Sequence, residues 1–421
     1  MSLQERDKKH LWHPLKQHQL NPDSMAIVKA KGCILTDEDG NEYIDAISSW
    51  YTCVFGHCND FITNRVYQQM RQLDQVMFSD FTHEPAVKLS EELIKILPQG
   101  QNRIFFNDNG STAVEASIKM ALQYYFNKGE KRSNFIAFED GFHGDTFGAM
   151  SVSGLSVYNG PFEDFLMDVK RIPVPNGENH DEILTQLEEY INQNDIAGFI
   201  YEPLVQGAAG MKIHDAKGLN AILKLCKSSG VLTIADEVMT GFGKTGKNFA
   251  SDYIETKPDI VCLSKALTAG LLPMAITSCT EEIYEAFLSN DIAKGFFHCH
   301  TYSANPVACS AALAGIELLQ TEEIQNNIQE ISAAHQEFSE RVKLHPKVKS
   351  TRHIGIIFAL DLNTETERYG GLRDKLLKFF MDRGVFLRPL GNTLYLQVPY
   401  IISKEELSKV YKVMEEALDA L

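Results

Sequence analysis

Lys265 and the acidic pair Asp236-Glu237 are the residues whose type and spacing most directly indicate chemistry. Lys265 follows an apolar run that reads as a β-strand, and Asp236 ends the preceding predicted strand. A lysine amine can hold the aldehyde of pyridoxal phosphate covalently, and a carboxylate facing the pyridine nitrogen keeps the ring able to take up electrons. The ordinary alternative is that Lys265 is a solvated lysine in a loop and Asp236 is a helix cap. This pair of residues alone does not exclude that alternative.

Two further motifs follow predicted strands. The segment NDNGST, which contains Gly110 and Ser111, opens a helix. Free N–H groups and the dipole at a helix start hold phosphate, and the hydroxyls of Ser111 and Thr112 are additional donors. In the segment EDGFHGD, the ring of Phe142 can lie flat on a planar cofactor. A helix cap and a polar turn are the ordinary alternatives. All these residues follow predicted strands, where an open α/β sheet binds its ligands.

The elements that must position these residues alternate through the middle of the chain. Helical spacing of apolar residues predicts helices at 113–127 and 219–228. The predicted strands are mostly apolar on both faces, which is typical of a largely parallel sheet covered by helices on both sides. These strands lie at 103–107, 134–138, 198–201, 231–235, 259–263 and 274–278.

After about residue 307 the pattern becomes that of a smaller α+β unit. A strand is expected at 354–362, a hairpin from 385–388 and 394–398, and an amphipathic helix at 404–421. A second hairpin, at 31–45 with an Asp-Gly turn, is expected to pack against this unit. We therefore expect three segments: 1–48 as the N-terminal part of the small domain, 49–306 as the large cofactor-binding domain, and 307–421 as the C-terminal small domain.

Composition limits the classes of partner. The 421 residues are 44% hydrophobic and 23% charged, as in a folded, soluble protein with more than one core. The formal net charge of −16 argues against nucleic acid and anionic membranes as partners. No stretch reads as a membrane span, and the start lacks the apolar segment of a secretory signal. The eight cysteines show no CxxC pair, so we expect a reducing cytoplasm.

With these motifs in place, the chain resembles the class-III, fold-type I pyridoxal phosphate aminotransferases. It is similar to the branch that converts 8-amino-7-oxononanoate to 7,8-diaminononanoate in biotin synthesis. The resemblance runs from His10 almost to the C-terminus. The segments that carry it are HLWHP at 10, SSWY at 48, GSTAVE at 110, GFHGDTFGAMS at 141, EPLVQG at 202, ADEV at 235, SKALT at 264 and LRP at 387.

This resemblance implies a fold, a cofactor and an assembly. The fold would be a large, mostly parallel α/β/α sheet domain with a smaller α+β domain built from both termini. Pyridoxal 5′-phosphate would be the cofactor, and S-adenosyl-L-methionine the usual amino donor. The protein would be a homodimer whose subunits share their active sites, and its other partners would be small-molecule substrates.

The resemblance also implies roles for single residues. Lys265 would be the Schiff-base lysine and the base that moves the proton, and Asp236 would pair with the pyridinium. The binding residues would be Gly110, Ser111 and Thr301 of the partner subunit for the phosphate, Phe142 for the cofactor ring, Trp50, Tyr51 and Phe142 for the substrate pocket, and Arg388 for the substrate carboxylate. Without the resemblance, Arg388 reads as a surface arginine.

Three positions depart from the residues that the family usually has. Leu15 and Phe142 stand where tyrosine is usual, and Lys244 stands where arginine is common. Because two phenols are lost, the donor remains open between S-adenosylmethionine, lysine and other amines. A broader ω-amino acid or diamine aminotransferase is the rival function within the same class. Glu202 follows a predicted strand and reads either as a support of the cofactor site or as a structural carboxylate.

Two patterns point to other classes of function. The segment GFGKTGKN at 241–248 nearly matches the phosphate-binding loop of ATPases, but Asn248 replaces the hydroxyl that Mg²⁺ requires. A set of histidines and cysteines has side chains that can bind metals: His298, Cys299, His300, Cys53, His57 and Cys58. Their spacing matches no structural zinc module, so we expect no metal.

Overall fold

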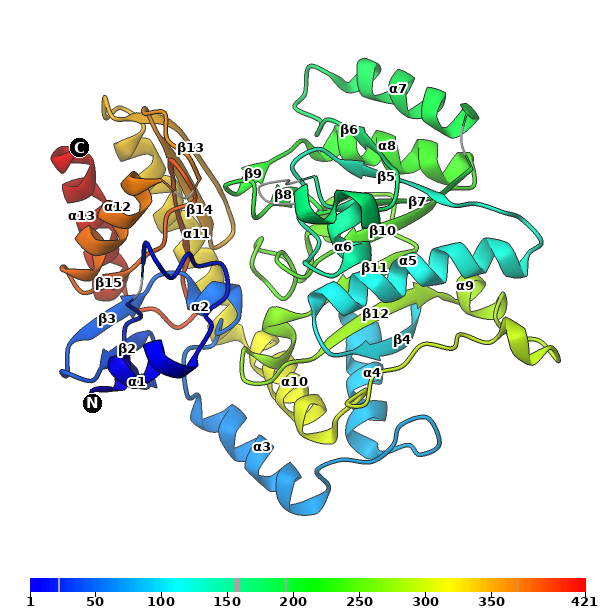
Figure 1. The fold of residues 1–421 in the computed structure, drawn as a ribbon, viewed down its shortest axis with the longest axis horizontal. Helices are drawn as coiled ribbons and strands as arrows, with labels where there is room; N and C mark the ends of the chain where they lie inside the picture. The colour runs from blue at the N-terminus through cyan, green and yellow to red at the C-terminus, as the bar shows by residue number, and fades with distance from the viewer. Residues whose placement is uncertain (22, 155–159, 194, 369) are drawn as a thin grey trace.

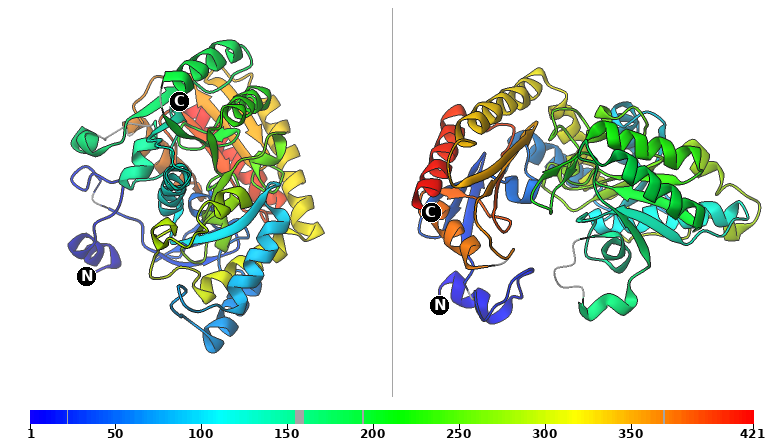
Figure 2. Two further views of the ribbon diagram at one scale, coloured as in Figure 1. Left: turned by 90° about the vertical axis from the view of Figure 1, so that its right-hand side faces the viewer. Right: turned by 90° about the horizontal axis from the view of Figure 1, so that it is seen from above.

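The computed structural model describes residues 1–421 except 22, 155–159, 194 and 369 (Figure 1). Its elements form two groups that lie side by side. One group holds a seven-stranded sheet and its helices, and the other contains both chain termini (Figures 1 and 2). Among the described residues, no helix is both long enough and apolar enough to cross a bilayer.

The large sheet has the strand order β4-β12-β11-β10-β7-β5-β6. Among the described residues only β12 runs opposite to the other strands of this sheet, so the predicted, mostly parallel sheet is confirmed. The strands are β4 (Gln101–Asn107), β5 (Asn134–Phe138), β6 (Val169–Ile172), β7 (Ile196–Tyr201), β10 (Leu232–Asp236), β11 (Ile260–Leu263) and β12 (Ala275–Thr280).

Helices cover both faces of this sheet, as the apolar strand pattern predicted. On β10, Leu232 and Ile234 pack with helix α5 (Gly110–Asn127), whereas Ala235 packs on the opposite side with α8 (Ala216–Ser228). The strand β6 was missed because it lies at an edge and carries two charged residues. Both helices begin three residues earlier than predicted, since Asn109 and Asp215 cap their first turns.

The second group joins the two ends of the chain. One sheet pairs β1 (Ile27–Lys31), β2 (Ile34–Asp37) and β3 (Glu42–Asp45) with β15 (Val385–Phe386) from the C-terminal part. The antiparallel register of β2 and β3, with Ile34 opposite Ile44, confirms the N-terminal hairpin. The other sheet has the order β13-β14-β16, and its strands are β13 (Val348–Ile354), β14 (Ile357–Leu362) and β16 (Thr393–Gln397).

The predicted hairpin from 385–388 and 394–398 is wrong. Strand β15 pairs in parallel with β3, and β16 pairs with β14, so the two runs lie in different sheets. Between these two runs, the described residues form a single isolated antiparallel bridge, from Leu390 to Thr393. Pro389 has no N–H to donate to a ladder, and each apolar run finds a partner strand far away in the sequence.

The remaining elements cover these sheets or connect them. Their helices are α1 (Leu3–His10), α2 (Ser48–Tyr51), α3 (Asp60–Gln72), α4 (Glu84–Ile96), α6 (Phe147–Val152), α7 (His180–Gln193), α9 (Glu281–Glu285), α10 (Pro306–Leu319), α11 (Glu322–Val342), α12 (Gly371–Met381) and α13 (Lys404–Ala420). A short hairpin pairs β8 (Val205–Gln206) with β9 (Lys212–Ile213).

Candidate active site

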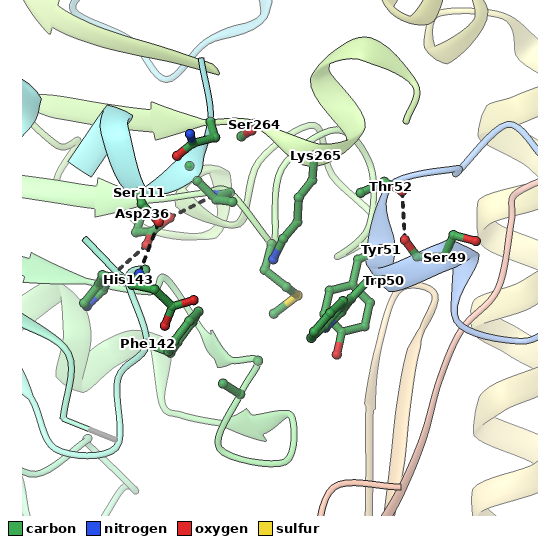
Figure 3. Close-up of a pocket in the computed structure, with 18 of the residues that line it drawn as sticks. Ser49, Trp50, Tyr51, Thr52, Ser111, Phe142, His143, Asp236, Ser264 and Lys265 are labelled. Carbon is green, nitrogen blue, oxygen red and sulfur yellow. Dashed lines mark hydrogen bonds and ion pairs between the residues drawn. The ribbon is translucent and has the colours of Figure 1, made fainter. Parts of the chain in front are cut away.

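A cavity of about 730 Å³ lies where the ends of the large-sheet strands meet the second group of elements. The structure brings together in its walls all but one of the residues expected to bind cofactor or substrate. These are Trp50, Tyr51, Gly110, Ser111, Phe142, Asp236, Lys265 and Arg388. Figure 3 shows most of them around one open space.

Lys265 lies just beyond the end of β11, and only Ser264 separates it from the strand. Its backbone is in the left-handed region, with φ of 50°, at the start of a 3₁₀ turn over Lys265–Thr268. The side chain extends into the open centre of the cavity, and its Nζ lies 5.1 Å from the ring centroid of Tyr51 (Figure 3). Burial lowers the pKa of this amine, although the carboxylates of Asp236 and Glu202 oppose the shift. A larger neutral fraction makes the amine a better nucleophile.

Asp236 ends β10 and faces the same space. Its Oδ2 lies 2.7 Å from Nδ1 of His143, and its Oδ1 accepts a hydrogen bond of 3.1 Å from the N–H of Val238. His143 is buried, and its backbone N–H donates to Oγ of Ser153 at 2.8 Å. This pairing fixes the orientation of the carboxylate. Sequence reasoning assigned His143 no role, although it directly follows Phe142 in a motif already selected.

The start of α5 supplies a cradle for an anion. In the described residues, no protein acceptor takes the N–H groups of Gly110 and Ser111. The loop after β5 approaches closely, since a Cβ on Gly144 would lie 2.2 Å from Oγ of Ser111. Thr112 does not take the role of phosphate donor that was expected: its hydroxyl donates to the carbonyl of Asn109 at 2.8 Å and completes the helix cap.

Trp50 and Tyr51 stand on a left-handed turn. The φ values of Ser48, Ser49, Trp50 and Tyr51 lie between 45° and 71°, a conformation that costs roughly 1–2 kcal/mol per residue for L-amino acids. The turn directs both rings toward the cavity, opposite Phe142 (Figure 3). Tyr51 is buried, whereas Trp50 and Phe142 keep about 46% and 38% of their surface exposed.

Hydrogen bonds with the nearby Asp45 and with the distant Gln397 hold this turn. Asp45 accepts from the backbone N–H of Ser49 at 2.7 Å and from its hydroxyl at 2.9 Å. His57 lies 2.8 Å from the same carboxylate oxygen. Although burial opposes it, hydrogen bonding to Asp45 and Cys53 raises the pKa of His57 to about 10, so the imidazole is protonated near neutral pH. The hydroxyl of Ser48 donates to the carbonyl of Gln397 at 2.6 Å.

Glu202 supports the loop that carries Phe142. Its two carboxyl oxygens accept hydrogen bonds from the N–H groups of Phe142, at 3.0 Å, and Gly207, at 2.9 Å. Burial raises its pKa to about 7, with the charge of Asp236 adding to the shift and His143 opposing it. Since Glu202 also lines the cavity, both of the expected readings apply to it: it is structural, and it adjoins the site.

Replacing Glu202 by glutamine should change how stability depends on pH. The folded protein binds this proton up to about pH 7, whereas an unfolded chain loses it near the ordinary value of 4.5. The contribution is therefore complete below pH 4.5 and is lost as pH rises through 7. It amounts to about 3 kcal/mol at most. We expect the Tm of the native protein to fall more steeply than that of Glu202→Gln between pH 5 and 8.

Glu255→Gln is the matched control for this measurement, because Glu255 is exposed and pairs with Lys224 at 2.7 Å. At pH 5, Glu202→Gln is also expected to be less stable than the native protein, since its amide NH₂ faces a backbone donor. The test therefore compares the slopes of the two Tm curves and not their heights. Parallel Tm curves for the native protein and Glu202→Gln would show that Glu202 does not titrate in this range.

Several other residues lie outside the cavity walls. Thr301 is exposed, and its carbonyl accepts a hydrogen bond of 3.0 Å from Nε2 of Gln75. Lys244 is fully buried, and burial lowers the pKa of its amine well below the ordinary value. The segment 241–248 forms turns and leads into no α-helix, so it lacks the helix start on which a phosphate-binding loop depends. The Nε2 atoms of His298 and His300 are 3.2 Å apart. In the described part of the chain, however, no three potential ligands converge on a metal position.

The chemistry of the cavity fits pyridoxal phosphate. A partly buried primary amine, a carboxylate fixed by a histidine, an anion cradle at a helix start and an aromatic ring all face one space. Each of the four matches one part of that cofactor: the aldehyde, the ring nitrogen, the phosphate and the ring face.

Comparisons with known proteins give the same result. The family described as Aminotransferase class-III matches residues 16–418. The chain is 43% identical to adenosylmethionine-8-amino-7-oxononanoate aminotransferase of Synechococcus elongatus, over 98% of this chain and 99% of that protein. It is 34% identical to the enzyme of the same name from Staphylococcus aureus, over 99% and 97%.

Solved structures agree. The adenosylmethionine-8-amino-7-oxononanoate aminotransferase of Methanocaldococcus jannaschii superposes with a TM-score of 0.93 at 32% identity, covering 99% of this chain and 98% of that one. The omega transaminase of Pseudomonas jessenii, solved in complex with PMP, gives a TM-score of 0.90 at 25% identity, covering 100% and 98%. Because the family matches nearly the whole chain and the cavity carries the groups that its cofactor needs, this protein belongs to the class-III aminotransferases and uses pyridoxal 5′-phosphate.

Proposed function

We propose that this enzyme transfers an amino group to 8-amino-7-oxononanoate and forms 7,8-diaminononanoate, a step of biotin biosynthesis, with S-adenosyl-L-methionine as the amino donor. Relatives that carry this activity in their names are similar to the chain over nearly its full length. The observation that carries the proposal is the cavity itself. It places the amine of Lys265 among Asp236 and an aromatic wall, and it also contains Arg388.

The residues of the chain divide the work of the reaction. The cofactor, when bound, supplies a ring that accepts electrons from the reacting carbon. Lys265 Nζ takes a proton from the reacting carbon of the donor and delivers one to C7 of the acceptor. Asp236, which His143 orients, would hold the ring nitrogen of the cofactor. Asp236 is buried and Lys265 is partly buried, which shields both groups from bulk solvent.

The substrate is held by a wall and an anchor. Trp50, Tyr51 and Phe142 line the cavity and offer apolar faces to substrates of different shape, and Phe142 would hold the ring of the cofactor. The guanidinium of Arg388 lies 5.1 Å from the Trp50 ring centroid. From this position the guanidinium of Arg388, which can donate two parallel hydrogen bonds, binds the substrate carboxylate.

We further propose a homodimer in which Gly110 and Ser111 hold the phosphate together with Thr301 of the partner subunit. The exposed position of Thr301 outside the cavity of its own chain supports this arrangement. The division into 1–48, 49–306 and 307–421 is retained as a proposal for the domain bounds. The eight free cysteines support a reducing cytoplasm as the compartment.

An assay of paired substrates tests the proposed reaction. With S-adenosylmethionine as donor, 8-amino-7-oxononanoate should be converted to a product of the mass of 7,8-diaminononanoate. Ornithine and 4-aminobutyrate, offered as rival substrates, should react at least about 10²-fold more slowly, as kcat/KM. Lysine and other amines are screened as donors in parallel, because Leu15 and Phe142 both line the cavity without a phenol. Preference for ornithine or 4-aminobutyrate would establish the broader ω-amino acid enzyme instead.

A further inference from the structure

We propose that Arg368 forms a second carboxylate-binding position in the active-site cavity, separate from that of Arg388. The two guanidiniums would then serve carboxylates that lie at different distances from the reacting carbon. This inference deepens the proposed function, and it rests on that function for the identity of the two substrates.

Arg368 belongs to the segment between β14 and α12, and its side chain reaches the cavity. Its Nη1 donates a hydrogen bond of 2.7 Å to the carbonyl of Ala208, and both residues line the cavity. Arg388 lines it as well, against the ring of Trp50. The positive charges of Arg368 and Arg388 both act on the phenol of Tyr51, where they oppose the rise in pKa that burial causes. The two cations therefore both lie near one aromatic residue.

The charge balance around these arginines leaves them open to an anion. The chain carries a formal net charge of −16, and several arginines elsewhere are ion-paired, such as Arg352 with Asp361 at 2.7 Å. Within the described residues, no carboxylate lies within ion-pair distance of Arg368 or Arg388. A half-buried guanidinium without a counter-charge favours a ligand that brings one.

The start of helix α12 makes the region around Arg368 more positive. Arg373 lines the same cavity, but Asp374 lies 3.7 Å from its guanidinium and offsets its charge. Helix α12 begins at Gly371, and its N-cap residue Gly370 offers no side-chain acceptor to the first N–H groups. The positive end of the helix dipole favours negative charge nearby.

The chemistry of the proposed substrates requires two such positions. In an α-amino acid donor, the carboxylate is attached directly to the reacting carbon. In 8-amino-7-oxononanoate, the carboxylate and the reacting ketone are separated by a chain of roughly 7 Å at standard bond lengths. Because both reacting carbons must meet Lys265, the two carboxylates cannot occupy the same place. A single fixed guanidinium cannot bind both of them with two-pronged geometry.

Unreactive dicarboxylates are the direct probe of two positions. The holoenzyme is titrated with succinate, glutarate, adipate and pimelate, each beside the monocarboxylate of equal length, and the Kd is followed by calorimetry. At least one dicarboxylate should bind about 10-fold more tightly than its monocarboxylate. Arg368→Gln should remove that gain and leave binding of the monocarboxylates within about two-fold. Arg383→Gln, which loses an exposed pair with Glu416, should keep the gain.

The results also separate this inference from the proposed function. Equal binding of mono- and dicarboxylates, or a gain that survives in Arg368→Gln, overturns the second position. If the gain depends on Arg368 but 8-amino-7-oxononanoate is not aminated, the second position stands and the proposed substrate falls. Should Arg368→Gln fail to fold, Arg368→Lys keeps the charge and loses the planar fork, and it should lose most of the same gain.

Discussion

Replacing Lys265 by alanine is expected to abolish turnover, by at least about 10³-fold, and to remove the absorbance of the bound cofactor near the visible edge. Lys265 carries both effects because its Nζ stands at the open centre of the cavity and its pKa is lowered by burial. In the proposed mechanism it is both the point of covalent attachment and the base that moves the proton. Activity with each donor and the absorption spectrum of the purified protein provide the measurement.

The control for this variant is Lys224→Ala, which removes an exposed lysine that pairs with Glu255 at 2.7 Å. It should retain full activity and the cofactor spectrum. Borohydride reduction followed by mass spectrometry adds an independent test, since the native protein should gain the mass of the cofactor at position 265. Turnover and absorbance that both persist in Lys265→Ala would refute the assignment of the site.

The second large effect is expected for Asp236→Asn, which should lower kcat by about 10²–10⁴-fold while the cofactor stays attached to Lys265. The substitution keeps the shape of the side chain and its contact with His143 but removes the negative charge. Without that charge the ring nitrogen is less readily protonated, and the ring takes up electrons less well. The rate of each half-reaction, measured by stopped-flow absorbance, isolates this loss from substrate binding.

Glu237→Gln is the matched control, because the two acids are adjacent in the chain but face different surroundings. Glu237 accepts hydrogen bonds from the N–H groups of Ser251, at 2.7 Å, and Ala250, at 3.1 Å, and it does not line the cavity. Its replacement should lower Tm with little change in kcat. If Asp236→Asn kept native kcat, the carboxylate would have no electronic role at the ring.

The strands and the residues at their ends could be predicted from the sequence, because both are indicated by local patterns of residues. The strands β7, β10 and β11 are buried along their whole length, and they appear in the sequence as short apolar runs. Lys265, Asp236, Gly110 and Phe142 follow such runs closely. Once the sheet was expected to be parallel, a common edge for these residues followed from its geometry.

Pairing between distant segments was not within reach. The runs that form β15 and β16 carry strand propensity but no information on partners, so a nearby turn wrongly indicated a hairpin. The role of Thr112 was misassigned for a related reason: a hydroxyl at a helix start can bind a phosphate or close the helix cap, and only the side-chain geometry separates the two.

The amino-acid sequence alone determined the class of fold and the chemical types that gather at the end of the sheet, because periodicity and strand-end residues act over a few positions. Only the tertiary structure decided how the cavity wall is held. The left-handed turn of Trp50 and Tyr51 depends on a hydrogen bond from Ser48 to Gln397, 349 positions away, and Arg368 reaches the cavity through Ala208, 160 positions away. Such contacts depend on the packing of the whole chain, since no local pattern specifies which distant backbone carbonyl will be near.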